Sequence, residues 1–158
     1  MTAPHLTLFL NNLDEVTLRR VKQLGIDHVC MGGPQIPWTT ADLAERIETL
    51  RAHDLELALL MIFGFPHAVY GRPGRDEEID QVCASIRAAG EVGLPVVEYN
   101  FYAHRLTEGY HKVEGRGGAS LLAFDYDRAR DLPPQEGVGA HSLEQMWDNV
   151  TYFLQAVV

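Results

Sequence analysis

The chain has 158 residues, of which 46% are hydrophobic and 22% are charged, a composition typical of a soluble globular protein with one core. Its net charge of −9 repels polyanions, which argues against nucleic acid and anionic membrane surfaces as partners. No apolar run approaches the roughly 20 residues that cross a bilayer, and no basic segment followed by an apolar run indicates a signal peptide.

Four short apolar runs predict β-strands, and each is followed by a pattern typical of an α-helix. The run at 55–63 (LELALLMIF) is nearly continuous, as in a parallel strand that is covered on both faces. The last helix has the clearest signal, because Ser142 and Gln145 form a capping box and apolar residues then recur at helical spacing. Strands are predicted at 6–10, 28–31, 55–63 and 96–99, and helices at about 12–24, 41–53, 76–90 and 142–157.

This alternation of strand and helix predicts an α/β fold with a parallel sheet and right-handed crossovers. Two architectures remain open at this point. One is an open doubly wound sheet, and the other is a partial (β/α)₈ barrel of about four β/α units, since a complete barrel needs about 250 residues. The chain stops inside an amphipathic helix, so we expect it to be interrupted there. A half barrel leaves strand edges and apolar faces open, which favours self-association or a homo-oligomer.

The segment 94–127 contains a long polar excursion after the fourth predicted strand. Loops of this length inside a compact domain are uncommon and are usually functional. We therefore predict that the excursion forms one wall of a small-molecule site, with a short hairpin arm between residues near 110–113 and 121–124. His104, Arg105 and His111 are weaker candidates within it.

Five segments in order carry a resemblance to a known family: MGGPQIPWTTADL, GFPHAVYGRPGRDEEID, VVEYNFYAHRL, GRGGASLLAFD and MWDNVTYFLQAVV. Together they resemble D-mannonate dehydratases of the xylose isomerase-like (β/α)₈ barrel superfamily. The resemblance implies that residues 1–158 correspond to the N-terminal half of one barrel domain. It also implies a hydro-lyase of glucuronate catabolism that converts D-mannonate into 2-dehydro-3-deoxy-D-gluconate and water.

The resemblance further implies a cofactor, Mn²⁺ or a similar divalent ion, held by a His/Cys/His/Asp set in the family's other half. This sequence contains none of those positions, so we expect no metal ligands here and an isolated chain that is inactive. Two other functions stay open. One is a metal-dependent sugar isomerase or epimerase of the same superfamily, and the other is a non-catalytic domain that binds a sugar acid or a partner chain.

Five residues are candidates for binding a sugar acid. The resemblance matches His67 to a family histidine in the loop after the third strand, although a surface histidine is the plain alternative. Asn100 carries an amide that can hydrogen-bond a sugar hydroxyl or carboxylate. Arg116, which precedes Gly117 and Gly118, can bind a carboxylate through two hydrogen bonds. Tyr99 either lines the site or packs, and Trp38 either covers a sugar ring or packs before a helix. The catalytic base is not identified.

The two cysteines, Cys30 and Cys83, are predicted to be small buried hydrophobes. Two cysteines do not make a disulfide framework, so a reducing cytoplasm is the expected location. The scattered histidines lack metal-ligand spacing, and the glycine-rich pieces GRPGR and GRGG do not sit at a strand–helix turn. Nucleotide binding is therefore rejected.

Overall fold

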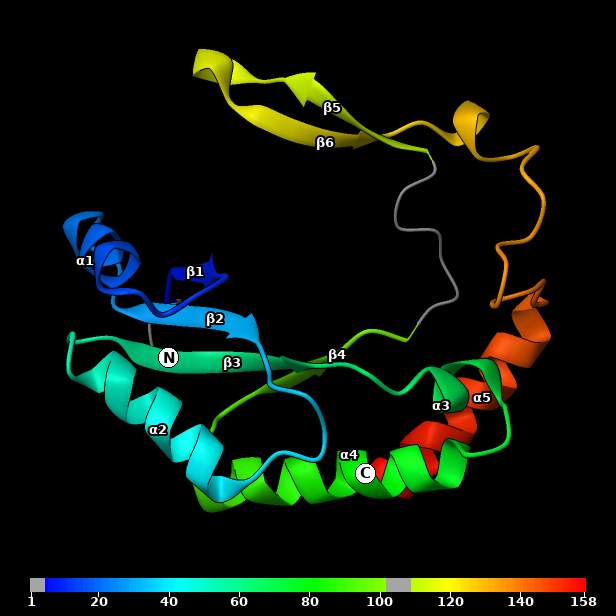
Figure 1. Cartoon of the computed structure of the whole chain (residues 1–158), viewed down its shortest axis with the longest axis horizontal. Helices are drawn as coiled ribbons and strands as arrows, with labels where there is room; N and C mark the ends of the chain where they lie inside the picture. The colour runs from blue at the N-terminus through cyan, green and yellow to red at the C-terminus, as the bar shows by residue number, and fades with distance from the viewer. Residues whose placement is uncertain (1–4, 102–108) are drawn as a thin grey trace.

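The computed structural model of the chain describes residues 5–101 and 109–158. These residues form a four-stranded sheet, a separate two-stranded hairpin and five α-helices (Figure 1). The sheet strands are β1 (Thr7–Leu10), β2 (His28–Gly32), β3 (Glu56–Ile62) and β4 (Val97–Tyr99), and the hairpin strands are β5 (Tyr110–Glu114) and β6 (Ser120–Phe124). The helices are α1 (Glu15–Gln23), α2 (Thr40–Arg51), α3 (Pro66–Tyr70), α4 (Arg75–Glu91) and α5 (Leu143–Val157).

The sheet has the order β1-β2-β3-β4, and each neighbouring pair is parallel. The four predicted strands and the four long helices are therefore confirmed. The hairpin predicted within the excursion is confirmed as well, with β5 and β6 antiparallel. The short helix α3 was not predicted. It forms because Pro66 suits the first helical turn and Gly71, at φ 63°, ends the helix in the left-handed conformation.

Only one face of the sheet is covered by helices. Alternate residues on that face, such as Val29, Leu60 and Ile62, are almost fully buried against apolar side chains of the helices. The opposite face is the open face of the sheet, where Phe9 is 49% and Phe63 46% exposed. A doubly wound sheet buries both faces, so this one-sided cover indicates the half-barrel architecture.

In the described part of the chain, no helix is long and apolar enough to cross a membrane.

Several helix starts show why the sequence folds as it does. Asp14 caps α1 by accepting from the amide of Thr17 at 2.9 Å, and Ser142 and Gln145 form the predicted capping box of α5.

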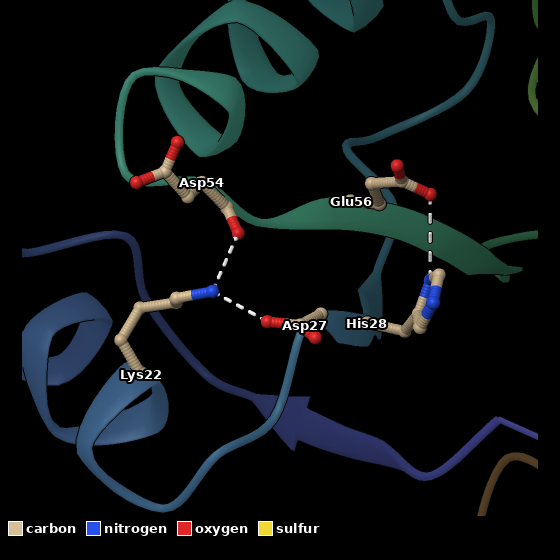
Figure 2. Close-up of polar contacts among 5 residues, drawn as sticks. All are labelled: Lys22, Asp27, His28, Asp54 and Glu56. Atoms are coloured by element: carbon tan, nitrogen blue, oxygen red, sulfur yellow. Dashed lines mark hydrogen bonds and ion pairs between the residues drawn. The ribbon is translucent and has the colours of Figure 1, made fainter.

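A polar network ties the N-terminal ends of β2 and β3 to α1 (Figure 2). Lys22 of α1 donates to the carboxylate of Asp27 and to the carbonyl of Asp54, the latter at 3.0 Å. Beside it, His28 Nδ1 lies 3.5 Å from Glu56 Oε2. Polar groups at this end of a barrel serve stability, because the chemistry of such folds occurs at the other end.

The pair formed by Lys22 and Asp27 makes stability depend on pH. The hydrogen bond from Lys22, and then its positive charge, hold the pKa of Asp27 below its ordinary value of 3.8. A carboxyl whose pKa is lower in the folded state stabilises the fold above the unfolded-state pKa, and this is lost as the pH falls through the folded-state pKa. In a double-mutant cycle of Lys22→Met and Asp27→Asn, we expect a favourable coupling near pH 6 that declines below about pH 3.8. Urea unfolding measures the coupling, and a value that stays constant down to about pH 3 would contradict this assignment.

Candidate functional site

The C-terminal ends of the four parallel strands meet at one edge of the sheet. Active sites of barrel folds are built at this edge from the residues that follow the strands. Here β1 runs into Asn11 and Asn12, β2 into Gly33, and β4 into Asn100. The candidate site is therefore the strand-end edge together with the adjoining part of the open face.

Asn100 lies on the open face just after β4. Its side-chain amide donates to the sulfur of Met61 on β3 at 3.1 Å, and the residue is exposed. This placement agrees with the predicted role, because the amide stands at the strand-end edge where a ligand has access.

Glu98 lies on the same face as Asn100, since it is two residues earlier in an extended strand and pairs with Met61. The sequence interpretation missed this residue. The sequence could have indicated it, because Glu98 is the one charged residue in the VVEY strand and alternation from Asn100 places both side chains on the same face. An exposed carboxylate there can accept a hydrogen bond from a hydroxyl group.

Tyr99 lies on the opposite face and packs there, which is the second of the two alternatives that the sequence left open for it. Its ring centroid is 5.6 Å from that of Phe153 on α5, and the residue is 38% exposed on the helix-covered side. The reason is the same alternation that puts Asn100 on the open face: adjacent strand residues point to opposite sides.

Trp38 is only 3% exposed, which rules out the predicted lid over a sugar ring. Its indole Nε1 donates to the carbonyl of Pro34 at 2.9 Å. The ring packs on Gly33 so closely that a Cβ at that glycine would lie 2.2 Å from Trp38 Cζ2. Trp38 therefore shapes the loop after β2 from within and does not face a ligand.

Ser85 of α4 fixes this loop from below. The serine is fully buried, and its hydroxyl accepts from the backbone amide of Trp38 at 2.9 Å while donating to the carbonyl of Gln81 at 2.7 Å. In Ser85→Ala the buried amide loses its acceptor, so we expect the free energy of unfolding to fall by about 1–3 kcal/mol. Urea denaturation measures the loss. Thr49→Ala is the control, because Thr49 donates only to a carbonyl of its own helix, and an equal loss in both variants would contradict a special role for Ser85.

His67 lies in the first turn of α3, directly after β3. Its Nδ1 is within hydrogen-bond distance of the carbonyl of Pro73, so Nδ1 carries the proton and Nε2 remains an acceptor. The residue is exposed, and no contact described for it reaches β4. The structure thus places His67 near the strand-end edge without joining it to Asn100.

Arg116 lies in the turn between β5 and β6, the closed end of a hairpin that stands apart from the four-stranded sheet (Figure 1). Gly117 and Gly118, at φ 68° and 77°, supply the left-handed conformations of this turn. No contact described for Arg116 reaches Asn100, so its role in binding a carboxylate stays a prediction. His104 and Arg105 lie outside the described residues.

A polar cavity of about 630 Å³ opens where β1 and β2 end, next to α2. Asn11, Asn12, Gln35 and Arg46 contribute polar side chains to its lining. The sequence interpretation did not predict this cavity. No short motif indicates it, since its residues come from three separate segments.

No group of three or more His, Cys, Asp or Glu side chains that could hold a metal ion is found within 5–101 and 109–158. Cys30 and Cys83 are both free and half-buried, and Cys83 donates to the carbonyl of Ala156 at 3.5 Å. The described residues therefore do not fit a divalent metal centre.

Comparisons with known proteins agree with this geometry. The family model described as D-mannonate dehydratase (UxuA) matches residues 5–141. The chain is 24% identical to the mannonate dehydratase of Streptococcus equi subsp. zooepidemicus over 175 residues and 25% identical to that of Thermotoga maritima over 182 residues. Each alignment covers 92% of this chain, but 48% and 51% of the respective relative, so the chain spans about half the length of the curated relatives it matches.

A solved structure has a similar fold. The crystal structure of mannonate dehydratase from Streptococcus suis serotype 2 matches with a TM-score of 0.82 at 23% sequence identity. The match covers 99% of this chain and 50% of that chain. The four β/α units are thus arranged as in part of a mannonate dehydratase, which confirms the partial barrel.

Proposed function

Because the chain belongs to the D-mannonate dehydratase family, we propose that it supplies one half of the sugar-acid site of a mannonate dehydratase-like hydro-lyase. The reaction is the conversion of D-mannonate into 2-dehydro-3-deoxy-D-gluconate and water. The family match over residues 5–141 carries this proposal. The strand-end edge supports it, because Asn100 and Glu98 stand there on an exposed face.

The reaction removes the proton next to the substrate carboxylate and expels the neighbouring hydroxyl group. Asn100 can hold a carboxylate or hydroxyl oxygen through its amide N–H groups, and Glu98 can accept a hydrogen bond from a hydroxyl. His67 keeps Nε2 free as an acceptor, since Pro73 occupies Nδ1. These groups position the substrate, and a general acid and base complete the elimination.

The family resemblance implies Mn²⁺ or a similar ion, which would polarise the substrate oxygens. Since the described residues form no metal site, we propose that its ligands lie outside them. A cytoplasmic location and a role in glucuronate catabolism complete the proposal. The two free cysteines support the cytoplasmic location, and the family match supports the role in glucuronate catabolism.

A chimera tests the proposed reaction class. This chain replaces the matching half of the Thermotoga maritima relative, and the product is screened with D-mannonate, other sugar acids, and aldose–ketose pairs. We expect dehydration of a sugar acid and no isomerisation. Interconversion of aldose and ketose would favour the isomerase alternative, and binding of a sugar acid without turnover in a folded chimera would favour a non-catalytic domain.

A further inference from the structure

The return segment, residues 137–141, leads from the hairpin back to the start of α5 (Figure 1). There it contacts the loop after β3, residues 63–74, which contains α3 and His67. The two stretches are distant in the sequence, since 65 positions separate Arg72 from Gly137. Their contact therefore joins the polar excursion to a loop at the strand-end edge.

Arg72 makes this contact through its guanidinium group. Its Nη2 donates to the carbonyls of Gly137 and Val138, the latter at 2.8 Å. The guanidinium also lies over the ring of Tyr70, with Cζ 4.8 Å from the ring centroid. A hydrogen bond from an ionised donor is roughly twice as strong as one between neutral groups. Two such bonds from one side chain therefore hold the return segment against the loop.

Tyr70 and His141 add a second contact between the same two stretches. Their rings stack with centroids 5.1 Å apart. His141 Nε2 lies 2.9 Å from the carbonyl of Val138, the same carbonyl that Arg72 binds, and its two lone pairs can accept both bonds. Arg72, Tyr70 and His141 are all half-buried, which strengthens these bonds relative to bonds in open water.

The backbone of the loop links Arg72 to the ring of His67. The amide of Arg72 donates to the carbonyl of His67 at 2.9 Å, and the amide of Arg75 donates to the carbonyl of Arg72 at 3.1 Å. The ring of His67 is bonded through Nδ1 to the carbonyl of Pro73, the residue after Arg72. The main chain at Arg72 therefore sets the position of the acceptor that orients this ring.

We propose that Arg72 is a positioning residue of the sugar-acid site, which fixes the ring of His67 by binding the loop after β3 to the return segment. In a neutral histidine either ring nitrogen can carry the proton, so an acceptor held at Nδ1 keeps Nε2 available as an acceptor for the substrate. This inference rests on the proposed function for its relevance to catalysis. The positioning itself is measured without a substrate.

The first test is nuclear magnetic resonance of the ¹⁵N-labelled chain, with the ring signals of His67 assigned by their absence in His67→Gln. In the neutral ring we expect the proton on Nδ1 in the wild type. Arg72→Met removes the donors, so we expect a larger share of the Nε2–H tautomer and hydrogen exchange at the amide of Arg75 that is at least about 10-fold faster. Arg72→Lys keeps a charged donor and is expected to exchange within about threefold of the wild type.

Arg130→Met is the matched control, because Arg130 pairs with the carboxylates of Asp127 and Asp131 and no contact described for it reaches the loop after β3. We expect wild-type behaviour in both measurements. A wild-type ring with its proton on Nε2, or an unchanged tautomer and exchange rate in Arg72→Met, would overturn the proposal. Equal effects of Arg72→Met and Arg72→Lys, or equally faster exchange at Leu60 in β3, would overturn it too, because packing or overall stability would then be the cause.

The second test asks whether the positioning acts on the reaction in the chimera. Arg72→Met is expected to lower kcat/KM for D-mannonate about 10-fold, and to have no further effect in a His67→Ala background, because both changes act through the same ring. Additive losses would overturn the proposed action through His67. A chimera that dehydrates no sugar acid would contradict the proposed function, whereas the tautomer and exchange measurements still decide whether Arg72 positions the ring.

Discussion

Replacing Phe153 with alanine is expected to lower the free energy of unfolding by about 3–5 kcal/mol. Phe153 is 1% exposed, and its ring stacks on Phe65 with centroids 5.2 Å apart. Its centroid is also 5.3 Å from that of Phe101 and 5.6 Å from that of Tyr99. This cluster joins α5 to the segments that follow β3 and β4, so removing its central ring leaves a cavity that rigid neighbours cannot fill.

Urea or guanidinium unfolding of Phe153→Ala measures the loss. Trp147→Ala is the matched control, because it removes a larger ring from the same helix at a position that is 63% exposed. We expect the control to change stability by less than about 1 kcal/mol. Equal losses in the two variants would show that α5 is not anchored through the aromatic cluster.

Replacing Asn100 with alanine in the chimera is expected to lower kcat/KM for D-mannonate about 10- to 100-fold, the effect of losing one or two hydrogen bonds to a charged or polar substrate. The amide of Asn100 is held on the open face by Met61 and is exposed at the strand-end edge. Asn100→Asp is expected to lose more, because a second carboxylate repels the substrate carboxylate.

Tyr99→Phe is the control for this experiment, since Tyr99 is the adjacent residue and lies on the helix-covered face. It is expected to retain the activity of the unmodified chimera. Loss of activity in Tyr99→Phe with none in Asn100→Ala would mean that the faces of β4 are assigned the wrong way round.

Much of the fold could be predicted from the sequence, because local patterns determine it. The continuous apolar run of β3 and the capping box of α5 are signals within one segment, and both elements form where expected. The hairpin was also predictable from apolar residues on either side of Gly117 and Gly118. The short α3 was not, since its five residues are too few to show a period.

The candidate site was harder to predict, because it depends on which face a side chain takes. Asn100 and Tyr99 are neighbours in sequence, yet only strand pairing shows that they point to opposite sides. The sequence allowed Trp38 to cover a ligand, but its ring packs on Gly33 and its backbone amide donates to Ser85. The position of Arg116 depends on the direction in which the hairpin extends, and no local pattern in the sequence determines that direction.

The most direct test of the central claim compares the isolated chain with the chimera in an assay of D-mannonate dehydration with Mn²⁺. If the chain carries half of the sugar-acid site, the chimera forms 2-dehydro-3-deoxy-D-gluconate, and the isolated chain forms none under the same conditions. Turnover by the isolated chain at a rate comparable to that of a full-length relative would contradict the claim. A folded chimera that binds Mn²⁺ but dehydrates no sugar acid would contradict it as well.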